Sequence, residues 1–414
     1  MSDGVFDVVI VGGGLAGGLT ALALHQARPN FRIAIIEAGK TFGGNHRWSW
    51  FASDLDKRGT ALVEAFRKID WGDGYDVSFP LLKRTLGTGY TSLSSADFHE
   101  GLTRLLPPEA MYLGRKATQI TADAVTLDDG TNLEARLVVD ARTFQPSAHL
   151  KGGWQVFMGR HIRLNHAHGV ERPVIMDGDV DQVAPYGNGA AYRFVYVLPL
   201  GAHDVFIEDT YYADEGRMDR AALSGRIDQY AAARGWNDGV PVGHEAGLLP
   251  VLTGGDFNAY LDEVRTDGVV AIGARGGFTH PLTSYTIPIA VDNAIVLADE
   301  ADLPPRQMAA LFEARARRHW RVTAYYRLLN RFLFFAADPE RRVNVLQRFY
   351  GLRQGLIERF YAGRSPLRDK VRILSGKPPV SIRRAIAAMF QSGKPLKQRG
   401  KSDINASSTT EPAA

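Results

Sequence analysis

Runs of apolar residues separated by glycine turns dominate the start of the chain. Residues 6–11 are almost continuously apolar, a pattern typical of a parallel strand buried on both faces. An apolar stretch over 15–24 suits a buried helix, and a second apolar run over 32–36 suits another strand. This succession predicts a β-α-β unit.

The pattern changes twice further along the chain. Strands are expected over much of 154–212, and they predict an antiparallel sheet inserted between nucleotide-binding segments. From residue 305 the apolar spacing is helical, with breaks, up to residue 390. Residues 41–51 carry a Gly-Gly-Asn turn signal and are expected to form a loop. The predicted fold class is α/β: a Rossmann-type nucleotide-binding domain with an inserted antiparallel β-sheet domain and a C-terminal helical region.

The amino-acid composition excludes several kinds of site. The chain has 414 residues, a formal net charge of +4 and no cysteine, which excludes disulfides, thiolate metal sites and cysteine nucleophiles. Its 11 histidines show no ligand spacing, so no metal site is expected. No apolar run reaches the roughly 18–20 residues that a bilayer-spanning helix needs. The first residues do not resemble a signal peptide.

A glycine motif follows the first predicted strand. Gly12, Gly14 and Gly17 form the pattern G-x-G-x-x-G between a strand and a helix, and Glu37 ends the next strand. In that context the glycines allow a tight turn, backbone approach to a pyrophosphate, and close helix–strand packing. The helix N-terminus attracts the phosphates, and Glu37 can accept both hydroxyls of an adenosine ribose. A purely structural glycine turn is the alternative.

A second glycine turn, late in the chain, favours FAD over NAD(P) as the bound nucleotide. Gly273, Arg275 and Gly277 lie at the end of an apolar strand. In many two-domain flavoproteins such a strand returns to the first sheet and holds the ribityl and pyrophosphate part of FAD. Residues 137–141 resemble the strand that runs beside the flavin in those proteins.

Five groups of residues, spread over most of the chain, resemble those of the bacterial lycopene β-cyclase family of carotenoid biosynthesis. The first group is general to flavoproteins, whereas the other four are specific. The groups are 7–17 with 36–39; 43–46 with 48–49; 206–210 (FIEDT); 273–277 with 280–285; and 335–339 with 348–350.

The resemblance implies an FAD-dependent intramolecular lyase or isomerase. Such an enzyme closes the ψ-ends of lycopene into β-rings, giving γ-carotene and then β-carotene without net redox change. Family members need reduced FAD, with NAD(P)H or another donor as reductant. Other flavoproteins carry Asp in the late glycine turn, whereas this chain has Arg275, whose cation suits an anionic reduced flavin.

Acid-initiated cyclisation needs a protonated carboxyl in a dry pocket. Side chains alternate along a strand, so Phe206, Glu208 and Thr210 share one face. Asp209 points to the other face. The resemblance matches Glu208 to the essential acid, and burial in an apolar site would raise the pKa of Glu208 and keep it protonated. An ordinary ion-pair role for Glu208 is the alternative.

Two further groups of residues have two interpretations each. His280 is either a loop histidine or part of the proton transfer. Trp48, Trp50 and Phe51 either line a polyene tunnel, where their π faces stabilise a cation, or belong to the core.

The C-terminal region is basic, with seven Lys or Arg and no carboxylate over 377–401. Ile382, Ile386, Met389 and Phe390 share one face of a predicted helix there. Because lycopene, the substrate that the resemblance implies, is water-insoluble, the expected location is cytoplasmic, in peripheral contact with the inner face of the bacterial membrane. A basic amphipathic helix suits that contact, and a surface helix packed on the body is the alternative. Nucleic acid is not an expected partner, because aromatic residues do not alternate with the basic ones.

Domain boundaries follow from these assignments. The expected domains are 1–55, 95–150 and 265–300 for FAD; 56–94 and 151–264 for substrate; 301–396 for the helical region; and 397–414 for a disordered tail. A flavin-dependent monooxygenase acting on a lipid or aromatic substrate is the alternative enzyme, and a non-catalytic flavin-binding membrane partner is the alternative from another class. The sequence leaves open how many ends are cyclised, the reductant and the oligomeric state.

Overall fold

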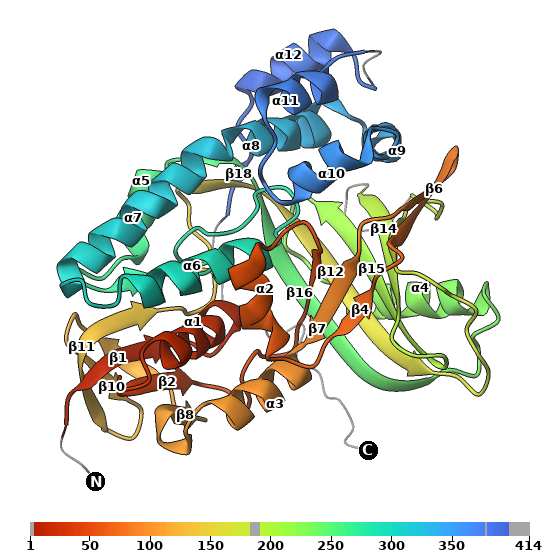
Figure 1. Ribbon diagram of the computed structural model, residues 1–414. Coiled ribbons are helices and arrows are strands. Elements are labelled where there is room, and N and C mark those ends of the chain that lie inside the picture. Colours follow the sequence, from red (N-terminus) through yellow and green to blue (C-terminus); the bar gives the residue numbers. More distant parts are fainter. Residues whose placement is uncertain (1–3, 183–190, 377–378, 397–414) are drawn as a thin grey trace.

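Residues 4–182, 191–376 and 379–396 are described by a computed structural model, in which three sheets are flanked by helices (Figure 1). The first sheet lies at the lower left of the view and the second at the right. The helices of the C-terminal region lie at the top. This arrangement is the predicted α/β class.

The first sheet contains the start of the chain. Its strand order is β8-β2-β1-β11-β10-β9, and β17 pairs with β11. Its strands are β1 (Phe6–Val11), β2 (Ile33–Glu37), β8 (Met111–Leu113), β9 (Ala117–Ile120), β10 (Ala124–Leu127), β11 (Asn132–Asp140) and β17 (Val270–Ala271). β1 runs parallel to β2 and β11, and α1 (Leu15–Ala27) connects β1 to β2. The predicted β-α-β unit is confirmed, and the late strand β17 returns to this sheet.

The second sheet has the order β16-β12-β15-β14-β13-β5-β6, and β18 pairs with β12. Its strands are β5 (Tyr75–Phe79), β6 (Leu82–Leu86), β12 (Leu150–Arg163), β13 (Val174–Asp177), β14 (Tyr192–Pro199), β15 (Asp204–Ala213), β16 (Val240–Gly255) and β18 (Lys394–Pro395). The pairs around β12, β15 and β14 are antiparallel, as predicted. Helix α4 (Arg220–Ala232) packs on one face of this sheet.

A small third sheet corrects one prediction. β3 (Arg47–Phe51) pairs with β7 (Tyr90–Ser94), which also pairs with β4 (Ile69–Trp71). The loop predicted for 41–51 is therefore wrong over its second half. The partner strand lies far away in the sequence, so the local glycine signal does not reveal the pairing.

Helices make up most of the C-terminal region, as predicted. They are α7 (Pro305–Val322), α8 (Ala324–Arg331), η2 (Phe332–Ala336), η3 (Pro339–Arg341), α9 (Arg342–Tyr350), α10 (Gln354–Tyr361), α11 (Leu367–Leu374) and α12 (Ile382–Phe390). The remaining helices are α2 (Lys57–Glu64), α3 (Ser95–Leu105), η1 (Pro108–Ala110), α5 (Phe257–Val264) and α6 (Ile287–Asp299), of which α6 packs against α1.

Two expectations concern the membrane and the chain end. None of the helices in the described part of the chain combines the length and the hydropathy of a bilayer-spanning segment. The predicted disordered tail, 397–414, lies outside the described residues.

Candidate active site

The first glycine turn is shaped by contacts that exclude side chains. Gly12 has a φ of +107°, and a Cβ there would lie 2.7 Å from the carbonyl oxygen of Ala141. A Cβ on Gly17 would overlap the carbonyl oxygen of Gly12. At Gly14, by contrast, a Cβ would meet no described atom within 4 Å. Two of the glycines are therefore needed by the fold, whereas Gly14 borders open space.

That open space lies at the start of α1. Within the described residues, no side chain caps this helix N-terminus. Its amide groups and the positive end of the helix dipole are available to an anion. The arrangement fits the pyrophosphate of a dinucleotide.

Glu37 fixes the glycine turn from the end of β2. Its carboxylate accepts hydrogen bonds from the backbone N–H groups of Gly13 at 2.8 Å and Gly39 at 2.7 Å. A carboxylate has about four acceptor positions, so two such bonds leave capacity for ribose hydroxyls.

The late glycine turn lies beside the first one. Gly273 has a φ of +62°, and a Cβ there would lie 2.9 Å from Cβ of Ala16 in the first turn of α1. Gly277 has a φ of +79° and packs on the ring of Phe257. The structure thus brings together the two turns that the sequence assigned to one nucleotide.

Arg275 extends from the late turn towards the end of β11. Its Nε lies 2.8 Å from Oδ2 of the buried Asp140, and its Nη1 donates to Oε1 of Gln145 at 3.0 Å. Asp140 also accepts from Arg142. Arg275 is therefore an ion-pair partner that joins the late turn to the first sheet.

A pocket lies where β3, β7, β15 and β16 approach the segment after the late turn. We call it the acid pocket, and its walls include Arg47, Trp48, Tyr90, Phe206, Glu208 and Glu245. Thr210 Oγ1 donates to Oε1 of Glu208 at 2.9 Å. Burial raises the pKa of Glu208 to about 7; the Thr210 bond opposes this rise and the charge of Asp209 adds to it. The structure places Glu208 where a proton can be held near neutral pH.

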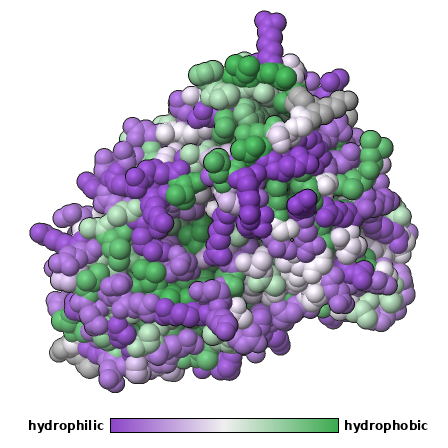
Figure 2. All heavy atoms as spheres, turned by 45° about the horizontal axis from the view of Figure 1, so that its top comes forward, coloured by the Kyte–Doolittle hydropathy of each residue, from purple (hydrophilic) through white to green (hydrophobic). Residues whose placement is uncertain are grey.

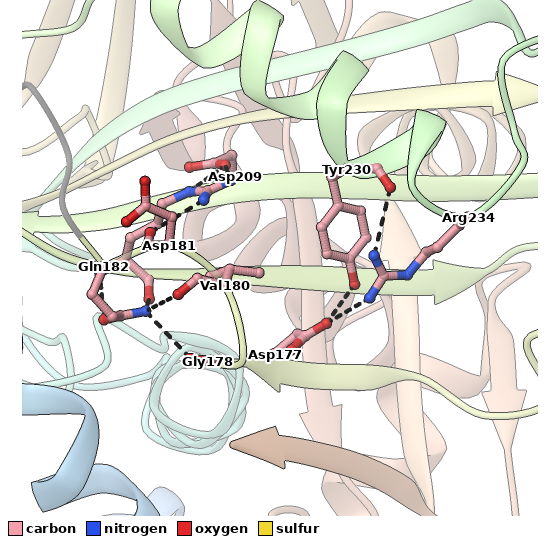
Figure 3. Close-up of polar contacts among 9 residues, drawn as sticks. Asp177, Gly178, Val180, Asp181, Gln182, Asp209, Tyr230 and Arg234 are labelled. Atoms are coloured by element: carbon pink, nitrogen blue, oxygen red, sulfur yellow. Dashed lines mark hydrogen bonds and ion pairs between the residues drawn. The ribbon is translucent and has the colours of Figure 1, made fainter. Parts of the chain in front are cut away.

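Asp209 occupies the opposite face of β15, as strand alternation predicts. It is fully buried and accepts from Nε of Arg193 at 2.8 Å and Nη2 at 2.5 Å. Figure 3 shows this face, where Asp177 accepts from Tyr230 at 2.7 Å and Arg234 at 2.8 Å beneath α4. The ion-pair role considered for Glu208 is therefore the arrangement found at Asp209.

Glu245 is a second carboxyl in the acid pocket that the sequence analysis missed. Gly159 of β12 is in register with Glu208 on one side and with Glu245 on the other. Burial raises the pKa of Glu245; repulsion from Glu208 adds to the rise and Arg47 opposes it. The signal that would reveal Glu245 is the pairing of β16 with β12, which is not local in the sequence.

The other candidate residues divide between pocket and core. His280 is buried, and its Nδ1 accepts from the N–H groups of Leu282 at 3.3 Å and Thr283 at 3.2 Å. Burial lowers its pKa to about 3, so it is neutral and shapes the loop. Trp48 lines the acid pocket.

Trp50 and Phe51, by contrast, are buried in core clusters. Among the described residues, no three His, Asp or Glu side chains gather as a metal site requires.

An apolar cavity adjoins the acid pocket on the side of the C-terminal helices. The two share Gln155, Tyr196 and Thr283 as lining residues. The walls of the apolar cavity include Leu329, Leu333, Leu346, Phe349, Phe360 and Ile373. The apolar cavity and the acid pocket are therefore neighbours across these three shared side chains.

Apolar side chains also gather on the outside of the same helices. Figure 2 shows them at the top of the view, where Figure 1 places α11 and α12. The exposed members, which we call the apolar patch, are Leu367, Val371, Leu374, Ile382, Ile386, Met389 and Phe390.

Comparison with known proteins adds sequence relatives and a fold. A family model described as lycopene cyclase protein matches residues 7–387. Lycopene beta-cyclase of Pseudescherichia vulneris is 40% identical, over 95% of this chain and 100% of that protein. Lycopene beta-cyclase of Pantoea ananas is 38% identical, over 93% of this chain and 98% of that protein.

Solved structures at low identity show the fold alone. A geranylgeranyl bacteriochlorophyll reductase-like protein from Thermoplasma acidophilum has a TM-score of 0.61 and 13% identity, covering 91% of this chain and 97% of that one. A flavin-dependent halogenase from Xanthomonas campestris has a TM-score of 0.53 and 15% identity, covering 80% and 78%.

Proposed function

Since this chain belongs to the lycopene cyclase family, we propose that it is a lycopene β-cyclase, which closes the ψ-ends of lycopene into β-rings and gives γ-carotene and then β-carotene without net redox change. One observation carries the proposal. The half-buried carboxyl of Glu208 lines a pocket that adjoins an apolar cavity, and the two share Gln155, Tyr196 and Thr283 as lining residues. Acid-initiated closure of a hydrocarbon chain requires a protonated carboxyl in a dry, apolar space.

Glu208 is the proposed acid. Its raised pKa keeps it protonated in a large fraction of molecules near neutral pH. Protonation of a terminal double bond leaves a carbocation, which the neighbouring alkene attacks. The faces of Trp48, Tyr90 and Phe206 line the same pocket and can stabilise the positive charge.

FAD is the proposed cofactor, in its reduced form, with NAD(P)H as reductant. The residues that would hold it are Gly12, Gly14, Gly17, Glu37, Gly273, Arg275 and Gly277, and Asp140 of β11 pairs with Arg275 in the late turn. The open space at Gly14 and the uncapped start of α1 within the described residues support this assignment. When bound and reduced, FAD supplies negative charge that favours a nearby cation.

We also propose that the enzyme works at the inner face of the bacterial membrane, where its water-insoluble substrate resides. The apolar patch supports this, because its members repeat at helical spacing on α11 and α12. Arg368, Arg372 and Arg383 lie on these helices and suit anionic lipid headgroups.

The test compares two neighbouring carboxylates in a lycopene-accumulating bacterial host. Glu208→Gln keeps the size of the side chain and removes the acid, so the rate at which cyclised pigment forms should fall by a factor of about 10²–10⁴. Asp209→Asn, on the opposite face of β15, should reduce the specific activity of folded enzyme far less. Both purified variants should retain FAD. Near wild-type cyclisation by Glu208→Gln would place the acid elsewhere.

The monooxygenase alternative makes a different prediction about electrons. Lycopene and β-carotene are isomers, so a cyclase with dithionite-reduced FAD should turn over without oxygen. A requirement for one NADPH oxidised per product, with oxygen consumed, would favour the monooxygenase. The relatives matched over nearly the whole chain are cyclases, which favours the first outcome.

A further inference from the structure

The cyclisation proposed above moves two protons, and the acid pocket holds two carboxyls. One proton is delivered to start the reaction and another is lost from the ring to end it. We propose that Glu245 is a second catalytic carboxyl, which accepts the proton lost from the ring while Glu208 delivers the first one. This inference rests on the proposed function and adds a residue to it.

The strand register brings the two carboxyls to one face of the second sheet. Gly159 of β12 is directly opposite both Glu208 of β15 and Glu245 of β16. Residues in register across antiparallel strands point to the same face, and two strand spacings amount to about 10 Å between the Cα atoms. Both side chains line the acid pocket. Long glutamate side chains can therefore reach one substrate end from two sides.

The ring of Phe206 lies over Gly159. A Cβ at this position would overlap that ring, so the ring fills the space over the position that is in register with both carboxyls. Phe206, Glu208 and Glu245 all line the acid pocket. Burial raises the pKa of Glu245 and repulsion from Glu208 adds to the rise, so the two carboxyls act on each other across this pocket.

Arg47 distinguishes the two carboxyls. Arg47 lines the same pocket, and its positive charge lowers the pKa of Glu245. The negative charge of Glu245 in turn raises the pKa of Arg47. For Glu208 the polar neighbours that act on the pKa are Thr210 and Asp209. Burial raises the pKa of both carboxyls and Glu208 repels Glu245, so the pair holds one shared proton near neutral pH. Arg47 favours the remaining negative charge at Glu245, although the pKa of Glu245 stays above its ordinary value.

Other titratable groups facing the pair are weaker proton acceptors than a carboxylate of raised pKa. His46 lines the pocket from the segment before β3, and burial lowers its pKa, so its imidazole is neutral but a weakened base. Tyr90, Tyr196 and Tyr285 line the pocket from β7, β14 and the segment after the late turn, and burial raises the pKa of each phenol. These phenols stay protonated at neutral pH, which leaves Glu245 as the stronger proton acceptor beside Glu208.

The proton and electron balance is closed. The O–H bond of Glu208 breaks and a C–H bond forms at the terminal alkene. The neighbouring alkene supplies the electron pair of the new C–C bond. A ring C–H bond then breaks, its electron pair forms the ring double bond, and the proton goes to the carboxylate of Glu245. Proton transfer from Glu245 to Glu208 restores the starting state.

The test uses purified protein with dithionite-reduced FAD, and it analyses the ring as well as the rate. Glu245→Gln should lower the rate by about 10²–10³ while FAD content stays unchanged. Without its base, the cation should lose a proton from another carbon, so part of the product should carry a shifted or exocyclic ring double bond. The fall in wild-type activity at acid pH that reflects protonation of Glu245 should disappear.

Two controls separate catalysis from folding. Asp204→Asn, at the start of β15 and paired with His161 and Arg163, should keep the wild-type rate and the β-ring. If Glu245→Gln does not fold, Glu245→Asp carries the test, and a rate at least tenfold below wild type with the β-ring retained is expected. A wild-type rate in Glu245→Asp would then overturn the inference.

If the wild-type protein with reduced FAD forms no ring from lycopene, the proposed function itself is wrong. If wild type cyclises lycopene while Glu245→Gln keeps the rate, the pH profile and the ring double bond, only the role of Glu245 is wrong.

Discussion

The half-buried side chain of Glu208 lies in a pocket with aromatic walls, and its removal from water raises its pKa to about 7 from an ordinary value of 4.5. Between these two pH values the folded protein keeps the proton that the unfolded chain has released. Stability therefore falls as the pH rises from 4.5 to 7 and stays lower above that window. The group that the reaction needs thus weakens the fold at neutral pH.

Glu208→Gln should consequently stabilise the protein at alkaline pH. We expect the free energy of unfolding to rise by on the order of 1–3 kcal/mol at pH 8, because no charge remains to be buried. At pH 4 the change should be small, since the wild-type carboxyl is already protonated. Denaturant unfolding at both pH values measures the difference, and an equal effect at both would contradict the raised pKa.

Asp209→Asn is the control for this measurement, and it should lower the free energy of unfolding instead of raising it. This substitution weakens the pairing of the buried Arg193 and should destabilise the protein by about 3–5 kcal/mol or somewhat less if the amide still accepts a hydrogen bond.

Gly14 and Gly17 separate cofactor binding from folding. A side chain at Gly14 enters open space, so Gly14→Val should fold with an unchanged unfolding temperature in the absence of FAD and fail to bind the cofactor. A side chain at Gly17 overlaps the Gly12 carbonyl, so Gly17→Val should be destabilised as well. Flavin absorbance after gel filtration and thermal unfolding measure the two properties. Retention of FAD by Gly14→Val would contradict the assigned loop.

The sequence alone identifies Glu208 as a candidate acid, but it does not identify Glu245. The face of Glu208 follows from strand alternation, which is local. Glu245 enters the pocket only because β16 pairs with β12 in a particular register, and that register is a tertiary property.

Among the elements, α11 and α12 carry a prediction about lipid. The side chains of Ile386 and Phe390 are 55% and 83% exposed. Replacing both with serine should weaken binding to anionic vesicles roughly tenfold or more, because each apolar side chain loses its transfer free energy. Vesicle sedimentation at low and high salt measures the apolar and ionic contributions.

Val5→Ser is the matched control for this experiment. Val5 is 55% exposed and directly precedes β1, which lies far from α11 and α12 in the fold (Figure 1). It should bind vesicles as wild type does. Equal binding by the double variant and by wild type would show that another surface meets the membrane.

Helices and strands with a local sequence pattern were predicted well. Strands that form because they pair with a distant strand were not. β1, α1 and the C-terminal helices follow from apolar periodicity. β16 contains Pro241, Pro250 and several glycines, which weaken a strand signal. It forms at the edge of its sheet because it pairs along the full length of β12, where prolines are tolerated on the free side.

In the whole molecule, segments from all parts of the chain meet at the site. The walls of the acid pocket include side chains from β3, β7, β15, β16 and the segment after the late turn, and those of the apolar cavity include side chains from α8, α9 and α10. The α/β class was predictable because buried strands and glycine turns are local. The cavity was not, because its shape depends on how the C-terminal helices pack on the second sheet.

The carboxyls lie together in one pocket, whereas lycopene is a symmetrical chain with two reactive ends. Only one end can meet these carboxyls at a time, so a second ring requires the half-cyclised chain to leave, turn round and bind again. Such an enzyme is distributive rather than processive. We expect γ-carotene to accumulate before β-carotene in a time course, and surplus lycopene, which competes for rebinding, to raise the ratio of γ-carotene to β-carotene. A ratio independent of lycopene concentration would mean that the chain reverses its direction without being released.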